Sequence, residues 1–351
     1  MRQDFVTRLE RQLLEAAARE ARGGAVAGTV RVARRTAPWR LAAVGTALAA
    51  AAIAVLLAAA AVRDRNTTPS HPAPRVIAHT TLAGQGGMLL AAYGAVWAVD
   101  AETGRLLRVD PRDGKVRARI AMGGFVVVNR GAGSVWAARA NEVLRIDPAS
   151  SRVTARIRVP GLRAGDIVPA GGAMWLIEAG GVTRIDPARN AAGRPIGTSQ
   201  GGFQNVGANT DGRTLYVMRG DGRLLGFDAR TGKRLSSVHA AITGFPGAVA
   251  DGSVILEGDS GVIAIDPRTG RARWSRDLGA QRVNNSVLAG DALWVQATDR
   301  ATHRDRLWRL DAKTGQVTGS LVLPEFGAAG MAAVGSRIWV VSLSGELVVV
   351  Q

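Results

Sequence analysis

The chain of 351 residues contains no cysteine. This absence excludes disulfides, thiolate zinc sites, iron–sulfur clusters and cysteine nucleophiles. Histidine is scarce too, and the chain has only four: His71, His79, His239 and His303. None of them is spaced from a carboxylate as metal ligands or acid–base pairs are. The Gly-x-Ser-x-Gly pattern occurs once, at residues 197–201, but no helical periodicity follows it, so we do not interpret it as a nucleophile elbow. We therefore predict no catalytic residue, no bound metal and no cofactor.

Lysine is nearly absent, with three residues against 42 arginines, and the formal net charge is +17. The arginines are spread along the whole chain, and no basic cluster interleaved with aromatic residues stands out. Together with the high alanine and glycine content, this pattern is typical of the codon usage of a GC-rich genome. We expect no nucleic-acid partner.

Residues 1–40 are predicted to be a cytosolic segment that holds an amphipathic helix over residues 3–22. Its apolar residues recur every four positions as Phe5, Leu9, Leu13 and Ala17, and Gly23-Gly24 ends it. The helix is either a solvated or membrane-skimming cytosolic stub or a docking site for a cytosolic partner.

Residues 41–62 form a run of 22 residues without a charge, long enough for a transmembrane helix. Nine arginines precede it, so the positive-inside rule places the amino terminus in the cytoplasm and the remainder outside. Ala58-Ala59-Ala60 also resembles a signal-peptide cleavage site, which leaves a secreted protein as the alternative. Residues 63–74 contain three prolines and are predicted to be an extended linker.

From residue 75 the sequence repeats with a period near 40. The corresponding apolar positions are separated by 39, 39, 41, 39, 39 and 45 residues: Trp97, Trp136, Trp175, Tyr216, Ile255, Trp294 and Trp339. One unit contains four predicted strands: Phe125 to Arg130, Ser134 to Arg139, Glu142 to Asp147 and Val153 to Val159. This period and strand content predict an all-β fold, a seven-bladed β-propeller with four-stranded blades over residues 75–351.

The seventh unit ends at Gln351, one strand short. Residues 75–82 match the fourth-strand pattern of Val116 to Ile120 and precede the first unit. We predict that this strand completes the last blade and closes the ring, which removes an exposed edge.

Six aspartates end the third strand of successive units: Asp110, Asp147, Asp186, Asp228, Asp266 and Asp311. Each precedes a turn such as Asp266-Pro267-Arg268-Thr269-Gly270, so we predict that the carboxylates cap turns rather than bind metal or transfer protons. The repeated tryptophans are predicted to pack between blades.

These units resemble bacterial extracytoplasmic propeller repeats of the YVTN and virginiamycin-B-lyase-like kind. The segment from Ala264 to Trp274 is similar to the PQQ-like (quinoprotein-like) repeat. The resemblance covers residues 75–351. Its lyase members imply a metal and a histidine acid–base group, and its quinone enzymes imply eight units and a vicinal disulfide; the sequence offers neither set.

The loops that enter the first strands and the loops that join second to third strands should build the mouth of the propeller. We predict that ligand-binding residues lie there: Phe125, Arg163, Phe203, Gln204, Asn205, Phe245, Asn284, Asn285, Glu325 and Phe326. The alternative is that these phenylalanines plug the channel.

The resulting hypothesis is a single-pass bacterial membrane protein, anchored by residues 41–62, whose extracytoplasmic propeller is a non-enzymatic scaffold for a protein, peptide or cell-envelope ligand. One alternative is a transmembrane signal transducer in which residues 3–22 dock a cytosolic regulator. A lyase-like or quinoprotein-like enzyme is the other.

Overall fold

The computed structural model describes residues 72–351, apart from residues 83, 85, 125, 163–165, 199–203, 241, 243 and 325–326. The chain divides into two compact units, Met1–Ser70 and His71–Gln351, and the second is described below. The predicted cytosolic helix, the predicted anchor at 41–62 and most of the linker lie outside the described residues. Within the described part, no helix is long and apolar enough to cross a membrane.

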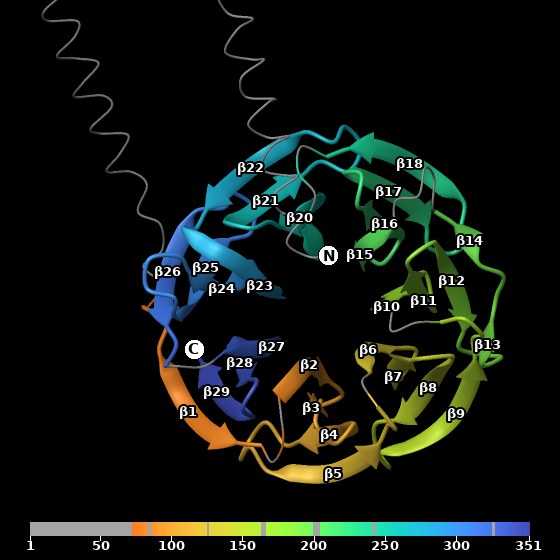
Figure 1. The fold of residues 1–351 in the computed structure, drawn as a ribbon, viewed down its shortest axis with the longest axis horizontal. Coiled ribbons are helices and arrows are strands. Elements are labelled where there is room, and N and C mark those ends of the chain that lie inside the picture. The colour runs from red at the N-terminus through yellow and green to blue at the C-terminus, as the bar shows by residue number, and fades with distance from the viewer. Residues whose placement is uncertain are drawn as a thin grey trace, which may run out of the picture. The chain divides into compact units, whose positions relative to one another are not determined.

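Seven antiparallel sheets are arranged around a central axis (Figure 1). This arrangement confirms the predicted seven-bladed propeller. The first four blades comprise β2(Gly86–Ala92), β3(Ala95–Asp100), β4(Arg105–Val109) and β5(Val116–Ala121); β6(Val127–Gly131), β7(Ser134–Arg139), β8(Glu142–Asp147) and β9(Arg152–Arg158); β10(Asp166–Ala170), β11(Ala173–Glu178), β12(Gly181–Asp186), β13(Ala191–Ala192) and β14(Ile196–Gly197); and β15(Asn205–Thr210), β16(Thr214–Arg219), β17(Arg223–Asp228) and β18(Arg234–His239). The last three comprise β19(Phe245–Ala250), β20(Ser253–Glu257), β21(Gly261–Ile265) and β22(Ala272–Asp277); β23(Ala280–Ala289), β24(Ala292–Asp299), β25(Asp305–Asp311) and β26(Val317–Val322); and β27(Ala328–Val334), β28(Arg337–Ser342), β29(Glu346–Val350) and β1(Val76–Thr81).

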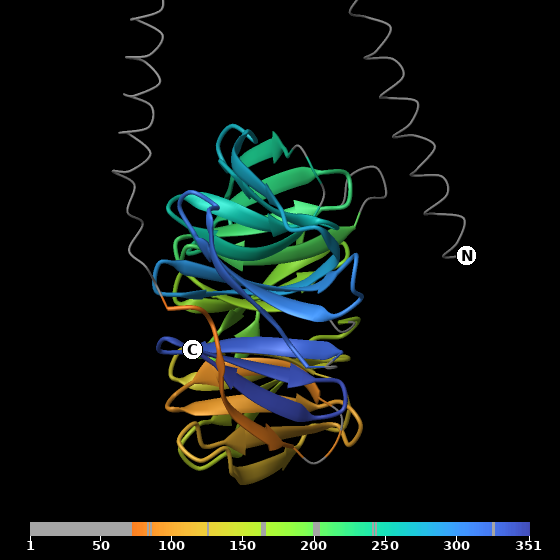
Figure 2. The same cartoon turned by 90° about the vertical axis from the view of Figure 1, so that its left-hand side faces the viewer.

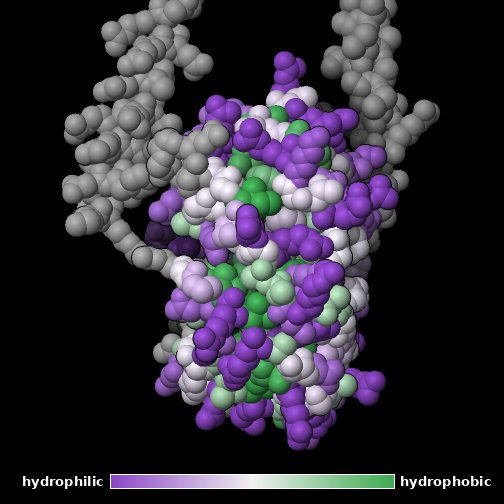
Figure 3. All heavy atoms as spheres, turned by 90° about the vertical axis from the view of Figure 1, so that its right-hand side faces the viewer, coloured by the Kyte–Doolittle hydropathy of each residue, from purple (hydrophilic) through white to green (hydrophobic). Residues whose placement is uncertain are grey.

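The second strand of a blade is apolar on both faces because both faces meet a neighbouring blade. In β3 every residue is buried, and Trp97 is fully buried. Outer strands instead alternate, as in β9, where exposed arginines flank partly buried Val153 and Ala155. Figure 3 shows one side of the ring, where hydrophilic residues make up most of the visible surface. The burial pattern therefore distinguishes the second strand of a blade from its outermost strand.

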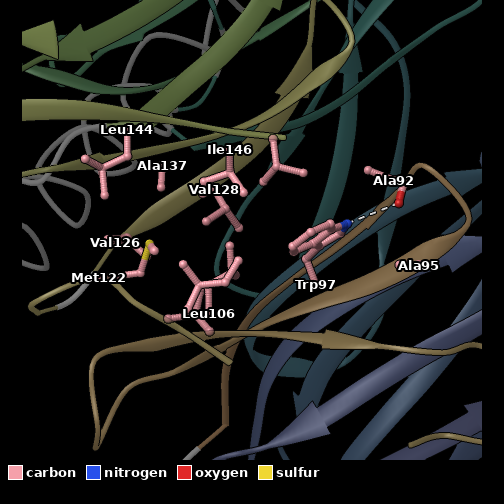
Figure 4. Packing of buried hydrophobic residues seen from close by; sticks show 13 residues of the cluster. Ala92, Ala95, Trp97, Leu106, Met122, Val126, Val128, Ala137, Leu144 and Ile146 are labelled. Carbon is pink, nitrogen blue, oxygen red and sulfur yellow. Dashed lines mark hydrogen bonds between the residues drawn. The ribbon is translucent and has the colours of Figure 1, made fainter. Parts of the chain in front are cut away.

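The hydrophobic core consists of clusters that each join two adjacent blades, one at every blade interface. Between the first two blades, Trp97 packs against Leu106 and Val128 (Figure 4). Its indole Nε1 donates a hydrogen bond to the carbonyl of Ala92 at 3.1 Å. Trp136 and Trp175 are equally buried at the next two interfaces, which confirms that the tryptophans pack blades together.

Strand β1 lies beside β29 and closes the ring, as predicted (Figures 1 and 2). The pairing runs from Val76 opposite Val350 to Thr81 opposite Glu346. Beyond it, Arg75 and Gln351 exchange two backbone hydrogen bonds of 3.0 Å. Leu82 follows the strand and is buried in the cluster between the last and first blades. The two ends of the propeller therefore share one blade.

The repeated aspartates cap their turns, as predicted. Asp110, Asp266 and Asp311 each accept a backbone N–H from two or three residues ahead, at 2.8–2.9 Å. Asp147 and Asp228 bond Ser150 and Thr231 in the same way. Backbone or hydroxyl hydrogen bonds hold the pKa of these carboxyls below the ordinary value. Their recurrence reflects turn formation.

One detail differs from the predicted four-stranded blade. The fourth strand of the third blade is split into β13 and β14, because Pro195 between them has no N–H to donate to β12.

Candidate ligand site at the mouth of the propeller

Antiparallel strands place alternate connections at opposite ends of the ring, so the starts of the first strands and the turns between second and third strands share one end. A cavity of about 690 Å³ opens there, and we call it the mouth cavity. A second cavity of about 550 Å³ lies against the innermost strands, and we call it the axial cavity. Both are lined by Met88, Asp166 and Phe245, so they adjoin each other.

The structure brings some of the predicted residues together. Asn205 and Phe245 line the mouth cavity, and Phe245, Asn284 and Asn285 line the axial cavity. Gln204 is exposed and lines neither cavity; its carbonyl accepts a hydrogen bond from the N–H of Gly220. The remaining predicted residues lie outside the described part of the chain: Phe125, Arg163, Phe203, Glu325 and Phe326.

The predicted amides differ in what they bond. The Nδ2 of Asn205 donates to the carbonyls of Glu178 and Gly181 at 2.7 and 3.2 Å, which holds the turn between β11 and β12. Asn285 Nδ2 donates to Gln296 Oε1 at 2.9 Å. Asn284 makes a longer bond of 3.3 Å to Thr298 Oγ1. The side-chain amide of Asn205 therefore holds the turn at the wall of the mouth cavity in place.

Apolar side chains, Val206 and Phe245, form part of the wall of the mouth cavity. Phe245 is 41% exposed and Val206 is 40% exposed. The Phe245 ring lies over Gly207, where any Cβ would overlap it. Glycine at this position thus lets the Phe245 ring approach the inner strand closely while much of its side chain stays exposed.

Two carboxyl groups line the same cavity. Asp166 Oδ1 accepts the N–H of Ile167 at 2.8 Å, yet burial raises the pKa of Asp166 to about 6. Burial also raises the pKa of Glu178, for which no side-chain hydrogen bond is seen among the described residues. No described lysine or arginine lines this cavity.

A third carboxyl lies in the axial cavity. Glu257 Oε1 accepts a hydrogen bond from Ser286 Oγ at 2.7 Å, across the interface of two blades. Burial raises the pKa of Glu257 to about 7, although the bond from Ser286 opposes the shift. Gly247 borders the pair, and a Cβ there would overlap both oxygens. Carboxyls with such raised pKa values occur often at functional sites.

Asx side chains tie the free edges of the innermost strands. Asn129 Oδ1 accepts the N–H of Arg130 at 2.8 Å, and its Nδ2 donates to the carbonyl of Ile167 in the next blade at 2.8 Å. Asn209 repeats the arrangement with Thr210 and Gly247. These bonds satisfy backbone groups that face the axis and link each of these strands to the next blade.

Asp166, Glu178, Glu257, Asn129 and Asn209 are absent from the predicted set. The available signal was an acid or amide interrupting an otherwise apolar inner strand, as Glu257 does after Val254-Ile255-Leu256.

The described histidines do not supply acid–base chemistry to either cavity, since His79, His239 and His303 line neither. Among the residues with a described placement, no three His, Asp or Glu side chains gather closely enough for a metal ion. The two cavities together present an aromatic ring, carboxyls, amides and a hydroxyl, groups that can hold a ligand.

Comparison with known proteins finds that residues 220–351 match a PQQ-type repeat family, whose model is described as outer membrane protein assembly factor BamB. The match runs from the second turn of the fourth blade to the end of the chain. No curated protein gives a significant match.

Proposed function

We propose that this β-propeller, whose residues 220–351 match a PQQ-type repeat family, is a membrane-anchored, extracytoplasmic binding module. It takes a protein, peptide or cell-envelope ligand at the mouth and does no chemistry on it. The observation that carries this proposal is the mouth cavity, in which the exposed faces of Phe245 and Val206 lie beside two carboxyls with raised pKa.

Exposed aromatic side chains next to polar groups are typical of recognition surfaces. The matched family model is described as an outer membrane protein assembly factor. We take this description as support for a macromolecular partner of the present chain over a small metabolite.

Photo-crosslinking in cells tests the mouth as the recognition surface. A photoreactive amino acid replaces Phe245, and the control carries it in place of Leu235, which is 58% exposed on the outer strand β18. We expect specific adducts from position 245 and none beyond background from position 235. Equal yields from the two positions would contradict the proposal.

The anchor and the outside location rest on residues 41–62 and the arginines that precede them. The absence of cysteine makes this testable with Leu235→Cys as the single thiol of the chain. A membrane-impermeant maleimide should label this variant in intact cells or spheroplasts, and the protein should stay in the membrane fraction after a carbonate wash. Labelling only after lysis would place the propeller inside.

A further inference from the structure

The mouth cavity has a charge character opposite to that of the whole chain. The formal net charge is +17. Yet the charged side chains described in the wall of this cavity are both acidic, Asp166 and Glu178. Asp166 also lines the adjoining axial cavity, whose wall contains Arg130 and Arg282, and neither arginine lines the mouth cavity.

The interactions described for these two carboxyls do not offset the hydration that they lose on burial. Asp166 is held by backbone N–H groups of Ile167 and Ala208, and burial still raises its pKa, so these bonds do not offset the lost hydration. Burial alone raises the pKa of Glu178, and its carboxyl has no hydrogen-bond partner in the described part of the chain. A cation that entered the cavity would supply the missing partner and would favour the ionised form of both groups.

The aromatic wall fits the same occupant. The Phe245 side chain is exposed enough to contact a guanidinium or an ammonium group through its ring. Val206 beside it offers apolar surface for the methylene stem that carries such a charge. Since the mouth cavity adjoins the axial cavity, whose wall holds the amides of Asn284 and Asn285, an extended backbone can continue past the charged residue and find hydrogen-bond partners.

We propose that the mouth cavity binds the side chain of an arginine or lysine presented by an extended segment of the partner protein, between the carboxylates of Asp166 and Glu178 and the ring of Phe245. This inference rests on the proposed function, because it names the chemistry that the mouth would select.

The test uses the purified full chain in detergent and a displayed library of random 12-residue peptides. We expect the wild-type protein to enrich peptides with arginine or lysine at one position, flanked by apolar residues. The most enriched peptide should bind about tenfold or more weakly to the Asp166→Asn, Glu178→Gln double variant by calorimetry. The control, Asp113→Asn with Asp291→Asn, removes the same charge at turns on the opposite end of the ring and should bind as wild type.

Folding is checked by the melting temperature, which should not fall in the double variant because an amide removes a desolvated charge. If that variant does not fold, Glu178→Gln alone serves, since no side-chain bond of Glu178 is lost among the described residues. Enriched peptides without arginine or lysine would overturn this inference and leave peptide binding intact. Enrichment of peptides rich in Asp or Glu, with binding lost in the Arg163→Ala variant, would also overturn it. Failure to enrich any peptide over a bare surface would contradict peptide recognition by the mouth, which belongs to the proposed function.

Discussion

Replacing Glu257 by glutamine should remove the free-energy cost of ionising a buried carboxyl, a cost that lowers the stability of the native state as the pH rises. The ordinary pKa of a glutamate here is 4.5, and burial raises that of Glu257 to about 7 in the folded protein. A raised carboxyl pKa means that the native state holds the proton more tightly than the unfolded chain between these two values. The free energy of unfolding therefore falls as the pH rises through this window, and the full penalty is present above it.

The size of the effect follows from the shift. A difference of roughly 2.5 pKa units corresponds to about 3 kcal/mol. The side chain borders a cavity, so partial screening reduces this to about 2–3 kcal/mol. The glutamine side chain would keep an oxygen for the hydrogen bond from Ser286. Asp166, Arg130 and Arg282, the other charged groups of the axial cavity, are present in both proteins.

Urea unfolding followed by tryptophan fluorescence measures this difference. At pH 4 the Glu257→Gln variant and the wild type should be about equally stable, and at pH 8 the variant should be more stable by about 2–3 kcal/mol. The exposed Glu102→Gln substitution serves as the control and should track the wild type at both pH values. Parallel pH profiles for wild type and Glu257→Gln would refute the burial argument for this carboxyl.

Three further perturbations test the ring itself. Deleting residues 75–82 should lower the melting temperature of the whole propeller by calorimetry, and a wild-type melting temperature would refute closure by β1. Gly247→Ala should destabilise by about 1–3 kcal/mol in urea because its methyl group would overlap Glu257 and Ser286, whereas Gly197→Ala, with open space around it, should cost under about 1 kcal/mol. Arg145→Ala removes a 2.8 Å bond to the carbonyl of Pro187 and a guanidinium over the Trp136 ring, so a loss of about 1–3 kcal/mol is expected; an unchanged urea midpoint would contradict this role.

The fold was predictable because its determinants are local and repeated. Each blade carries an apolar residue, usually Trp, on its second strand, and six of the seven carry an aspartate at the turn after the third. The contacts of these apolar residues and aspartates lie within one unit or between neighbouring units. The closing strand could be inferred from an unpaired third strand at the end of the last unit. A closed ring leaves no other place for residues 75–82.

The site was less predictable because inner strands contain bulges. The register of β15 shifts between Asn205 and Gly207, and that of β23 shifts between Val283 and Asn285. Each bulge reverses which side chains face the axis, so spacing alone did not separate structural amides from cavity groups. Asn205 was predicted for its position at the mouth, and its amide is engaged in a turn. Glu257 was not predicted, because its partner Ser286 lies 29 residues away.

Hydrogen–deuterium exchange of the full chain, with and without the partner captured by crosslinking from position 245, tests the central claim most directly. Binding at the mouth should slow exchange in the turn at residues 177–180 and at the starts of β15 and β19, and should leave the outer strands β9 and β22 unchanged. Protection confined to those outer strands would show that the partner binds the rim, and would contradict the mouth as the recognition surface.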